Sequence, residues 1–484
     1  MSDSLIKNIA NDLKCQATKV LLVENNDRFL FREDVIVKLA DEGINIVQGS
    51  PLKQRITYEL KDGHLLLILL SANRQNYLED ISSHSIRYEF FLQHYLGSYH
   101  IPSLIHEELP ILEILFSKNP VVGLTKKETL KEILSIKSQS PGSNFDTQQF
   151  KDAIEAELTQ EPVNWPVVLQ IISNGLIQAI GTKQYNDIVG VINDANEIFQ
   201  KDLAKNYAQL KNASAVKSPK IVSKILDYID FNYKAEKIAL IVVDGLSSWQ
   251  YDLFRDRIQA AKQEGCVYSW LPSITQLSRQ AIFKGDSPER TYRQNPANEE
   301  KLWLSYWKNK GLNSAEIRYQ HENTKLENLA PVKRFALVFK DLDDYMHSSK
   351  DYTDLLKLTE NWISRSKIVD VVHQLLNQNF RVFITSDHGN IQATGWRSLQ
   401  GREKLGTNKS GSRSERHIEY SENWLKDDLL KNNPDITDSV AQEEQAIYFK
   451  NNFSFSSKES LVTHGGSHIL EVLIPFVEIK NDQQ

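Results

Sequence analysis

Aspartate and histidine residues follow two apolar runs in the second half of the chain. Asp244 ends IALIVVD and precedes Gly245, which lets the chain turn sharply and leaves the carboxylate at the end of the run. Asp387 and His388 occupy the same position in FRVFITSDHG. An adjacent carboxylate and imidazole can direct an oxygen and a nitrogen at one cation. Because an aspartate at a strand end also commonly caps a helix, a metal site needs further ligands elsewhere in the chain.

A third motif, KDLDDYMH, places Asp343 and His347 four residues apart. If a helix begins here, this spacing puts both side chains on one helical face, as in helical metal pairs. Asp341 and Asp344 are alternative ligands in the same segment. An acidic helix start favoured by the helix dipole is the alternative explanation of the pattern. The sequence leaves these choices open, and we take Asp343 and His347 as the candidates.

The motif THGGSH precedes the last apolar run of the sequence. His464 stands directly before Gly465 and Gly466, and two glycines allow the backbone to pass close to a metal ion or a phosphate. His468 is a second candidate four residues later. We take His464 as the ligand, with His468 as the alternative.

A hydroxyl residue in LPSITQLSRQAIFK could act as a nucleophile. Thr275 falls in the first turn of a helix that is predicted to begin after Pro272. The positive end of a helix and a neighbouring metal ion both favour an alkoxide over a neutral alcohol. Arg279 lies four residues later on the same face, where its guanidinium could hold a phosphoryl oxygen. Ser273 and Ser278 are rival hydroxyls, and an ordinary helix cap is the alternative role of Thr275.

The segment 390–420 is rich in arginine, lysine, glycine and serine. A basic loop directly after two candidate ligands could follow a polyphosphate backbone, and Trp396 could stack on a base. Arg397, Arg413 and His417 are the candidates for phosphate contacts. A run of charges is equally typical of a solvated loop, which is the alternative interpretation.

Apolar runs that alternate with helical patterns predict an α/β fold, in which the carboxyl ends of parallel strands present these residues. A helix is expected over 248–263. The expected strands of the second half cover 237–244, 335–341, 380–387, 445–450 and 469–479. The predicted domains are an α/β accessory or interaction domain (1–118), a helical connector (119–231) and a catalytic α/β domain (232–484).

Composition excludes several classes of protein. The 484 residues are 40% hydrophobic and 25% charged, as in a globular protein of two or three domains. The net charge of −6 gives no overall basic field, so contact with nucleic acid requires a local patch. Only Cys15 and Cys266 occur, which is consistent with a reducing compartment. With no apolar run near the roughly 18 residues of a membrane span and no signal-peptide pattern, we expect a cytoplasmic protein without membrane contact.

The motifs D-G, P-S-I-T, D-L-D-D-Y-M-H, S-D-H-G and T-H-G-G occur in this order, and residues 232–484 resemble the PglZ domain of the alkaline phosphatase superfamily. The resemblance implies a helix/sheet/helix sandwich that holds two divalent ions, usually zinc, with manganese or magnesium as alternatives. It assigns Asp244, Thr275, Asp387 and His388 to one ion, and Asp343, His347 and His464 to the other. Thr275 would be the nucleophile, and two ions about 4 Å apart would stabilise the attacking and leaving oxygens.

The resemblance also implies an activity. PglZ proteins occur in bacterial anti-phage systems of the BREX type, and related domains occur in regulators that hydrolyse oligonucleotides. We therefore expect a metal-dependent phosphodiesterase or phosphatase that acts on nucleotidyl diesters, such as an oligonucleotide, a cyclic nucleotide or DNA, with other defence subunits as partners. The segment T-Q-L-S-R lacks the modified residue and the proline of sulfatases, which argues against sulfate esters. The alternative is a structural or regulatory subunit with little turnover.

Overall fold

The computed structural model divides the chain into two compact units, Met1–Ser143 and Asn144–Gln484. The structure describes residues 4–481 apart from 17–18, 26, 48–50, 61–64, 71–77, 84, 106, 119, 121–122, 140–144 and 408–413. The division falls inside the range 119–231 that the sequence predicts as a connector. Helix α7 (Lys126–Gln139) belongs to the first unit, whereas α8 (Thr147–Leu158), α9 (Trp165–Gly181) and α10 (Tyr185–Leu210) belong to the second.

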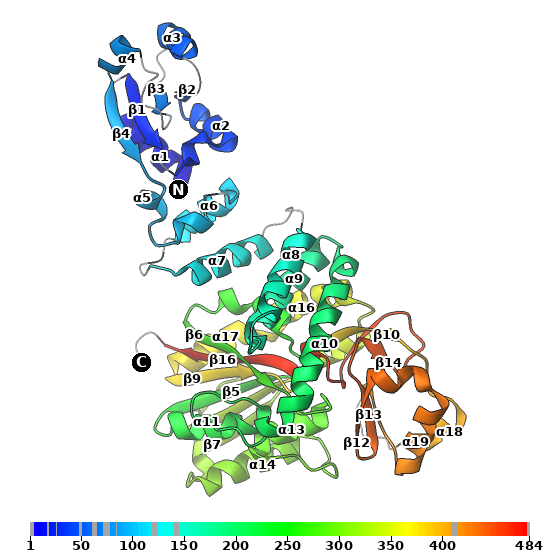
Figure 1. Cartoon of the computed structure of the whole chain (residues 1–484). Coiled ribbons are helices and arrows are strands. Elements are labelled where there is room, and N and C mark those ends of the chain that lie inside the picture. Colours follow the sequence, from blue (N-terminus) through cyan, green and yellow to red (C-terminus); the bar gives the residue numbers. More distant parts are fainter. Residues whose placement is uncertain are drawn as a thin grey trace. The chain divides into compact units, whose positions relative to one another are not determined.

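The first unit contains a parallel four-stranded sheet with the order β2-β3-β1-β4 (Figure 1). Its strands are β1 (Val20–Asn25), β2 (Ile44–Val47), β3 (Leu65–Leu70) and β4 (Ile86–Phe90). Its other helices are α1 (Leu5–Gln16), α2 (Glu33–Asp41), α3 (Pro51–Glu59), α4 (Glu79–Ser83), α5 (Gln93–Leu96) and α6 (Leu109–Lys118). The first four residues of β1 are apolar because Leu21 and Val23 pack in one core and Val20 and Leu22 in another.

The second unit is built on a mixed six-stranded sheet with the order β6-β16-β9-β5-β8-β7 (Figure 1). The strands are β5 (Lys237–Val243), β6 (Ala261–Tyr268), β7 (Ile317–His321), β8 (Arg334–Phe339), β9 (Phe380–Thr385) and β16 (Leu473–Lys480). Strands β9, β5, β8 and β7 are parallel to their neighbours in this series, and β16 is antiparallel to β6 and β9. The predicted α/β class is confirmed.

Helices cover both faces of this sheet, which explains the continuous apolar run of β5. Ala239, Ile241 and Val243 pack with residues of α12 (Ser248–Asp252), α16 (Tyr352–Ser366) and α17 (Ile368–Asn377). The alternate residues Leu240 and Val242 pack with α11 (Ile225–Asn232), α13 (Thr275–Lys284) and α14 (Pro296–Asn309). Figure 1 shows α11, α13 and α14 on one side of the sheet. Covered on both faces, the sheet offers its strand ends for a site.

The expected elements differ from the structure in three places. The helix expected over 248–263 ends at Asp252, and β6 begins at Ala261 as an edge strand beside β16. The strand expected over 469–479 begins as the short helix α20 (Ile469–Val472) before β16. The strand expected over 445–450, β13 (Ala446–Phe449), lies in a separate three-stranded sheet.

That separate sheet belongs to an inserted region, residues 391–463, between β9 and β16. It contains two small sheets with the orders β14-β10-β15 and β11-β13-β12. Its elements are β10 (Ile391–Gly395), α18 (Gly401–Leu405), β11 (His417–Glu419), α19 (Asn423–Asn432), β12 (Val440–Glu443), β13, β14 (Phe453–Ser454) and β15 (Leu461–Thr463). Among the helices that the structure describes, none has the length and apolar character of a membrane span.

Helix α10 fixes the backbone that follows the THGGSH motif. The Asn196 side chain donates to the Lys450 carbonyl at 2.9 Å and accepts from the Ile469 N–H at 3.0 Å. Gln200 donates to the Ser467 carbonyl at 2.6 Å and accepts from the Ser467 hydroxyl at 2.9 Å. The helices before β5 therefore take part in the construction of the sheet's carboxyl edge.

Candidate metal centre and active site

Two aspartates lie at the carboxyl ends of the adjacent strands β5 and β9. Asp244 directly follows β5, Asp387 follows β9 by two residues, and both side chains are buried. Gly245 turns the chain with a φ of 74°, a conformation that glycine adopts without strain, and its N–H donates to Asp387 Oδ1 at 3.1 Å. A Cβ added at Gly245 would lie 3.5 Å from the Cα of Asp343, so a third predicted ligand packs against this turn.

Two buried histidines present their Nε2 atoms to this edge. His388 Nδ1 lies 2.9 Å from the Gly389 carbonyl, and His464 Nδ1 lies 2.9 Å from the Ser273 carbonyl. A carbonyl oxygen only accepts, so each Nδ1 carries the proton and each Nε2 keeps a lone pair. Burial and the neighbouring His388 hold the pKa of His464 well below its ordinary value. Both rings, stacked with centroids 3.7 Å apart, are therefore oriented as metal ligands are.

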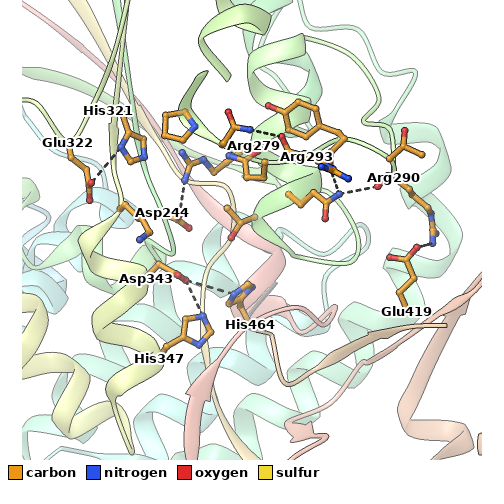
Figure 2. A pocket seen from close by; sticks show the side chains of 18 of the residues that line it. Asp244, Arg279, Arg290, Arg293, His321, Glu322, Asp343, His347, Glu419 and His464 are labelled. Carbon is orange, nitrogen blue, oxygen red and sulfur yellow. Dashed lines mark hydrogen bonds and ion pairs between the residues drawn. The ribbon is translucent and has the colours of Figure 1, made fainter. Parts of the chain in front are cut away.

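Helix α15 (Asp341–Ser348) supplies the third pair of side chains. Asp343 Oδ1 lies 3.5 Å from His347 Nε2 and 3.8 Å from His464 Nε2, and Figure 2 shows the three side chains directed at one another. Of the alternative acids, Asp344 pairs with Lys340 at 3.2 Å and Asp341 is exposed.

The alternative histidine, His468, lies outside this group. Its Nδ1 accepts from the Leu470 N–H at 3.3 Å and caps α20. The structure therefore brings Asp343 and His464 to the cluster in preference to their alternatives.

Donor atoms of these residues form two overlapping groups, each with all ligand atoms within 4.8 Å of one another. Among the residues that the structure describes, the groups are Asp343, His347 and His464, and Asp244, Asp343 and His388. Thr275, the first residue of α13, places its Oγ1 3.0 Å from His388 Nε2. Asp387 Oδ2 lies 3.7 Å from the same nitrogen. All seven predicted ligands thus converge.

One oxygen of each carboxylate in this cluster lacks a hydrogen-bond donor among the described residues. Asp244 Oδ1, Asp343 Oδ1 and Asp387 Oδ2 accept no hydrogen bond from the described part of the chain. Burial, together with Asp387 and Asp343, raises the pKa of Asp244 well above its ordinary value. Burial also raises the pKa of Asp387 to about 6, against the opposing effect of Arg279. Buried carboxylate oxygens without donors are costly, and divalent cations would supply the missing partners. The residue set therefore fits metal ions.

Arg279 is held by two carboxylates. Its Nη1 donates to Asp244 Oδ2 at 2.7 Å, and its Nη2 donates to Glu299 Oε2 at 2.7 Å. Tyr319 donates to the same Glu299 oxygen at 2.5 Å. The guanidinium is almost fully buried, so in this arrangement it orients Asp244. Glu299 is a residue that the sequence analysis missed, because NEEK in α14 reads as an ordinary solvated helix face.

A pocket of about 1110 Å³ opens beside the cluster (Figure 2). One wall comes from the segment between α13 and α14. The lining residues are Asp244, Thr275, Gln276, Arg279, Arg290, Thr291, Tyr292, Arg293, Gln294, Asn295, Pro296, His321, Glu322, Lys340, Asp343, His347, Glu419, Gln445 and His464. The volume exceeds what a single phosphoryl group needs and suits a nucleotide-sized ligand.

The predicted substrate contacts of the segment 390–420 are placed elsewhere. Trp396 donates to Asp435 at 2.7 Å, and Arg397 binds Glu403 with two hydrogen bonds of 2.7 and 2.8 Å. His417 is buried in β11, where burial and the nearby Arg290 lower its pKa to about 4. These three residues do not line the pocket. The prediction for Arg413 lies outside the described residues.

Comparison with known families agrees with this architecture. The family model described as the BREX system PglZ alkaline phosphatase-like domain matches residues 224–479. The chain belongs to this PglZ family and thereby to the alkaline phosphatase-like phosphoesterases. Members of that superfamily typically depend on divalent metal ions.

Solved structures of low identity also match the chain. Murine ectonucleotide pyrophosphatase/phosphodiesterase 5 is 11% identical, with 51% of this chain and 88% of that chain covered and a TM-score of 0.36. The human protein of the same name is 12% identical, with the same coverage and a TM-score of 0.35. Phosphonoacetate hydrolase from Sinorhizobium meliloti 1021 is 10% identical, with 51% and 90% covered and a TM-score of 0.34. No curated protein matches the chain.

Proposed function

We propose that the protein is a metal-dependent phosphodiesterase with Thr275 as its nucleophile. The observation that carries this proposal is the convergence of seven predicted ligands around buried carboxylate oxygens that lack donors. Asp244, Thr275, Asp387 and His388 would hold one divalent ion, and Asp343, His347 and His464 a second; zinc suits this mixture of nitrogen and oxygen donors.

The chain's own residues support nucleophilic displacement at phosphorus. The Thr275 hydroxyl stands at the positive end of α13, which favours the alkoxide. Its oxygen would form a bond to phosphorus as the bond to the leaving oxygen breaks, and water would then replace the threonine oxygen and release the phosphoryl group. Bound divalent ions supply charge stabilisation to the phosphoryl oxygens. Arg279 and the N–H of Gly245 keep Asp244 and Asp387 in place during these steps.

The substrate class follows from the pocket and the family. A nucleotide-sized pocket with several arginines favours nucleotidyl diesters, including short oligonucleotides, cyclic nucleotides or DNA, over small monoesters. The BREX description of the family supports a role in anti-phage defence beside other subunits. The first unit, Met1–Ser143, would then act as an accessory domain that binds such a partner.

Metal content and ester hydrolysis test the proposal together. Purified full-length protein is expected to contain zinc or to bind it, and to hydrolyse bis-p-nitrophenyl phosphate faster than p-nitrophenyl phosphate. Thr275→Ala should lower turnover by at least about 1000-fold, and Thr275→Ser should retain part of it. Bound metal without turnover of either ester would contradict the proposal and favour a structural subunit of a larger complex.

A further inference from the structure

The pocket wall between α13 and α14 is fixed to the helix that begins at Thr275. Gln276 donates from its side chain to the carbonyls of Arg290 and Tyr292, at 3.0 and 2.5 Å. One turn later, Gln280 accepts from the Glu289 N–H at 2.7 Å. The same helix therefore positions the proposed nucleophile and holds the backbone of this wall beside it.

Two arginines on this wall have free bonding capacity. The half-buried Arg290 lies 3.8 Å from Glu419 and 3.4 Å from Glu444, which are longer separations than the 2.7 Å contacts of Arg279. Arg293 is exposed, and its guanidinium makes no ion pair or hydrogen bond with any residue that the structure describes. Figure 2 shows both arginines at the pocket, apart from Asp343, His347 and His464.

Guanidinium groups with loose partners are suited to an anion that arrives with the substrate. A guanidinium binds phosphoryl oxygens through two parallel N–H donors, and that bond is stronger than a long ion pair to an exposed carboxylate. The scissile phosphoryl group would occupy the metal cluster, so an anion at Arg290 and Arg293 has to be a different group. Glu419, which also lines the pocket, lies 3.8 Å from Arg290 and would release it when this group binds.

We infer that Arg290 and Arg293 form a subsite for a second phosphoryl group on the same substrate as the scissile diester. This inference rests on the proposed function and narrows it: substrates with two linked phosphoryl groups, such as phosphorylated dinucleotides and longer oligonucleotides, are preferred over diesters with a single one. Arg290 and Arg293 on the pocket wall would select the substrate, and the metal-ligand cluster would carry out the hydrolysis.

Matched dinucleotides test the subsite. Thymidylyl-thymidine carries one phosphodiester, and its 5′- and 3′-phosphorylated forms add a second group on either side. For wild-type protein we expect kcat/KM for one phosphorylated form to exceed that of the parent by about tenfold, mainly through KM. In the double variant Arg290→Gln/Arg293→Gln this ratio should fall below about threefold. Arg365→Gln, which removes an exposed arginine of α16 outside the pocket, should keep the wild-type ratio.

The outcomes separate the two proposals. Equal kcat/KM for all three dinucleotides, an unchanged ratio in the double variant, or cleavage of bis-p-nitrophenyl phosphate without cleavage of any dinucleotide would overturn the subsite and leave the phosphodiesterase intact. Absence of hydrolysis of bis-p-nitrophenyl phosphate by metal-loaded protein would overturn the proposed function itself. Circular dichroism of each variant verifies that the fold is retained.

Discussion

The metal-ligand cluster and the inserted region both contain buried charge, but they differ in how that charge is paired. In the cluster, Arg279 pairs with Asp244 and Glu299, and Asp343 and Asp387 make no ion pair with an arginine or a lysine in the described part of the chain. In the inserted region, Arg416 is fully buried and donates to Glu471 at 2.9 and 3.0 Å and to three backbone carbonyls. In the cluster, one oxygen each of Asp244, Asp343 and Asp387 lacks a donor among the residues that the structure describes, whereas both oxygens of Glu471 accept hydrogen bonds from Arg416.

This difference shows which charges are available for a ligand. Glu471 also accepts from the N–H groups of Gly466 and His468, so the Arg416 pair fixes the backbone beside His464. A satisfied ion pair of this kind holds a loop in one conformation, whereas buried carboxylate oxygens without donors favour the binding of a cation. The following experiments test that distinction.

Removal of one charge from the cluster should have the largest effect. Asp387→Asn keeps the shape of the side chain but weakens cation binding, so hydrolysis of bis-p-nitrophenyl phosphate should fall at least about 1000-fold, equivalent to about 4 kcal/mol. Metal content, measured by mass spectrometry of the purified protein, should fall as well. Asp370→Asn on the exposed side of α17 is the matched control. Near wild-type turnover of Asp387→Asn would show that the metal-ligand cluster takes no part in the hydrolysis.

Disruption of the paired region should lower stability. Arg416→Met leaves Glu471 buried without its cation, and the free energy of unfolding should fall by about 3 kcal/mol. Urea titration followed by tryptophan fluorescence measures this change. The double variant Arg416→Met/Glu471→Leu should lose less than the sum of the single variants. Strict additivity would show that the two side chains do not act as a pair.

Removal of metal should lower stability by a similar or smaller amount. A ligand at 100 times its dissociation constant stabilises the folded state by about 2.7 kcal/mol. Treatment with a chelator should therefore lower the melting temperature of the wild-type protein, and added zinc should restore it. Asp387→Asn should show little response to either reagent. An identical melting curve with and without chelator would contradict metal binding by the cluster.

The smallest effect is expected at a paired but partly exposed arginine. Arg397 and Glu403 are each about one quarter exposed, with side-chain exposures of 29% and 23%. Water screens such a pair, so Arg397→Gln should cost less than about 1 kcal/mol in the same urea titration. If Arg397→Gln lowered the free energy of unfolding as much as Arg416→Met, burial would not explain the difference between the two ion pairs.

Sequence reasoning reached the α/β class and the positions of the central strands because these features depend on local pattern. Strands β5, β8 and β9 are covered on both faces, so each appears as a largely apolar run that ends near a polar residue. Motif order then singled out seven residues that the structure brings together. Their roles as ligands and nucleophile stay predictions, to be tested as described above.

Other features depend on partners that are distant in sequence. Glu299 and Arg279 meet only because α14 packs on α13, and nothing in NEEK marks that contact. The edge strand β6 follows a helical pattern, and its pairing with β16 overrides local preference. Composition predicts that the arginines of 390–420 are available for phosphate contacts. In the fold, Arg397 pairs with Glu403 and Arg416 pairs with Glu471, and the sequence does not indicate either contact.

Helix α10 has a consequence for the size of a working fragment. The family match begins at residue 224, whereas Asn196 and Gln200 lie in α10, before that point. A protein trimmed to 224–479 would leave the Ile469 N–H and the Ser467 carbonyl without the partners that hold the backbone after His464. A fragment that retains these contacts has to include α10, and the compact unit to which α10 belongs begins at Asn144.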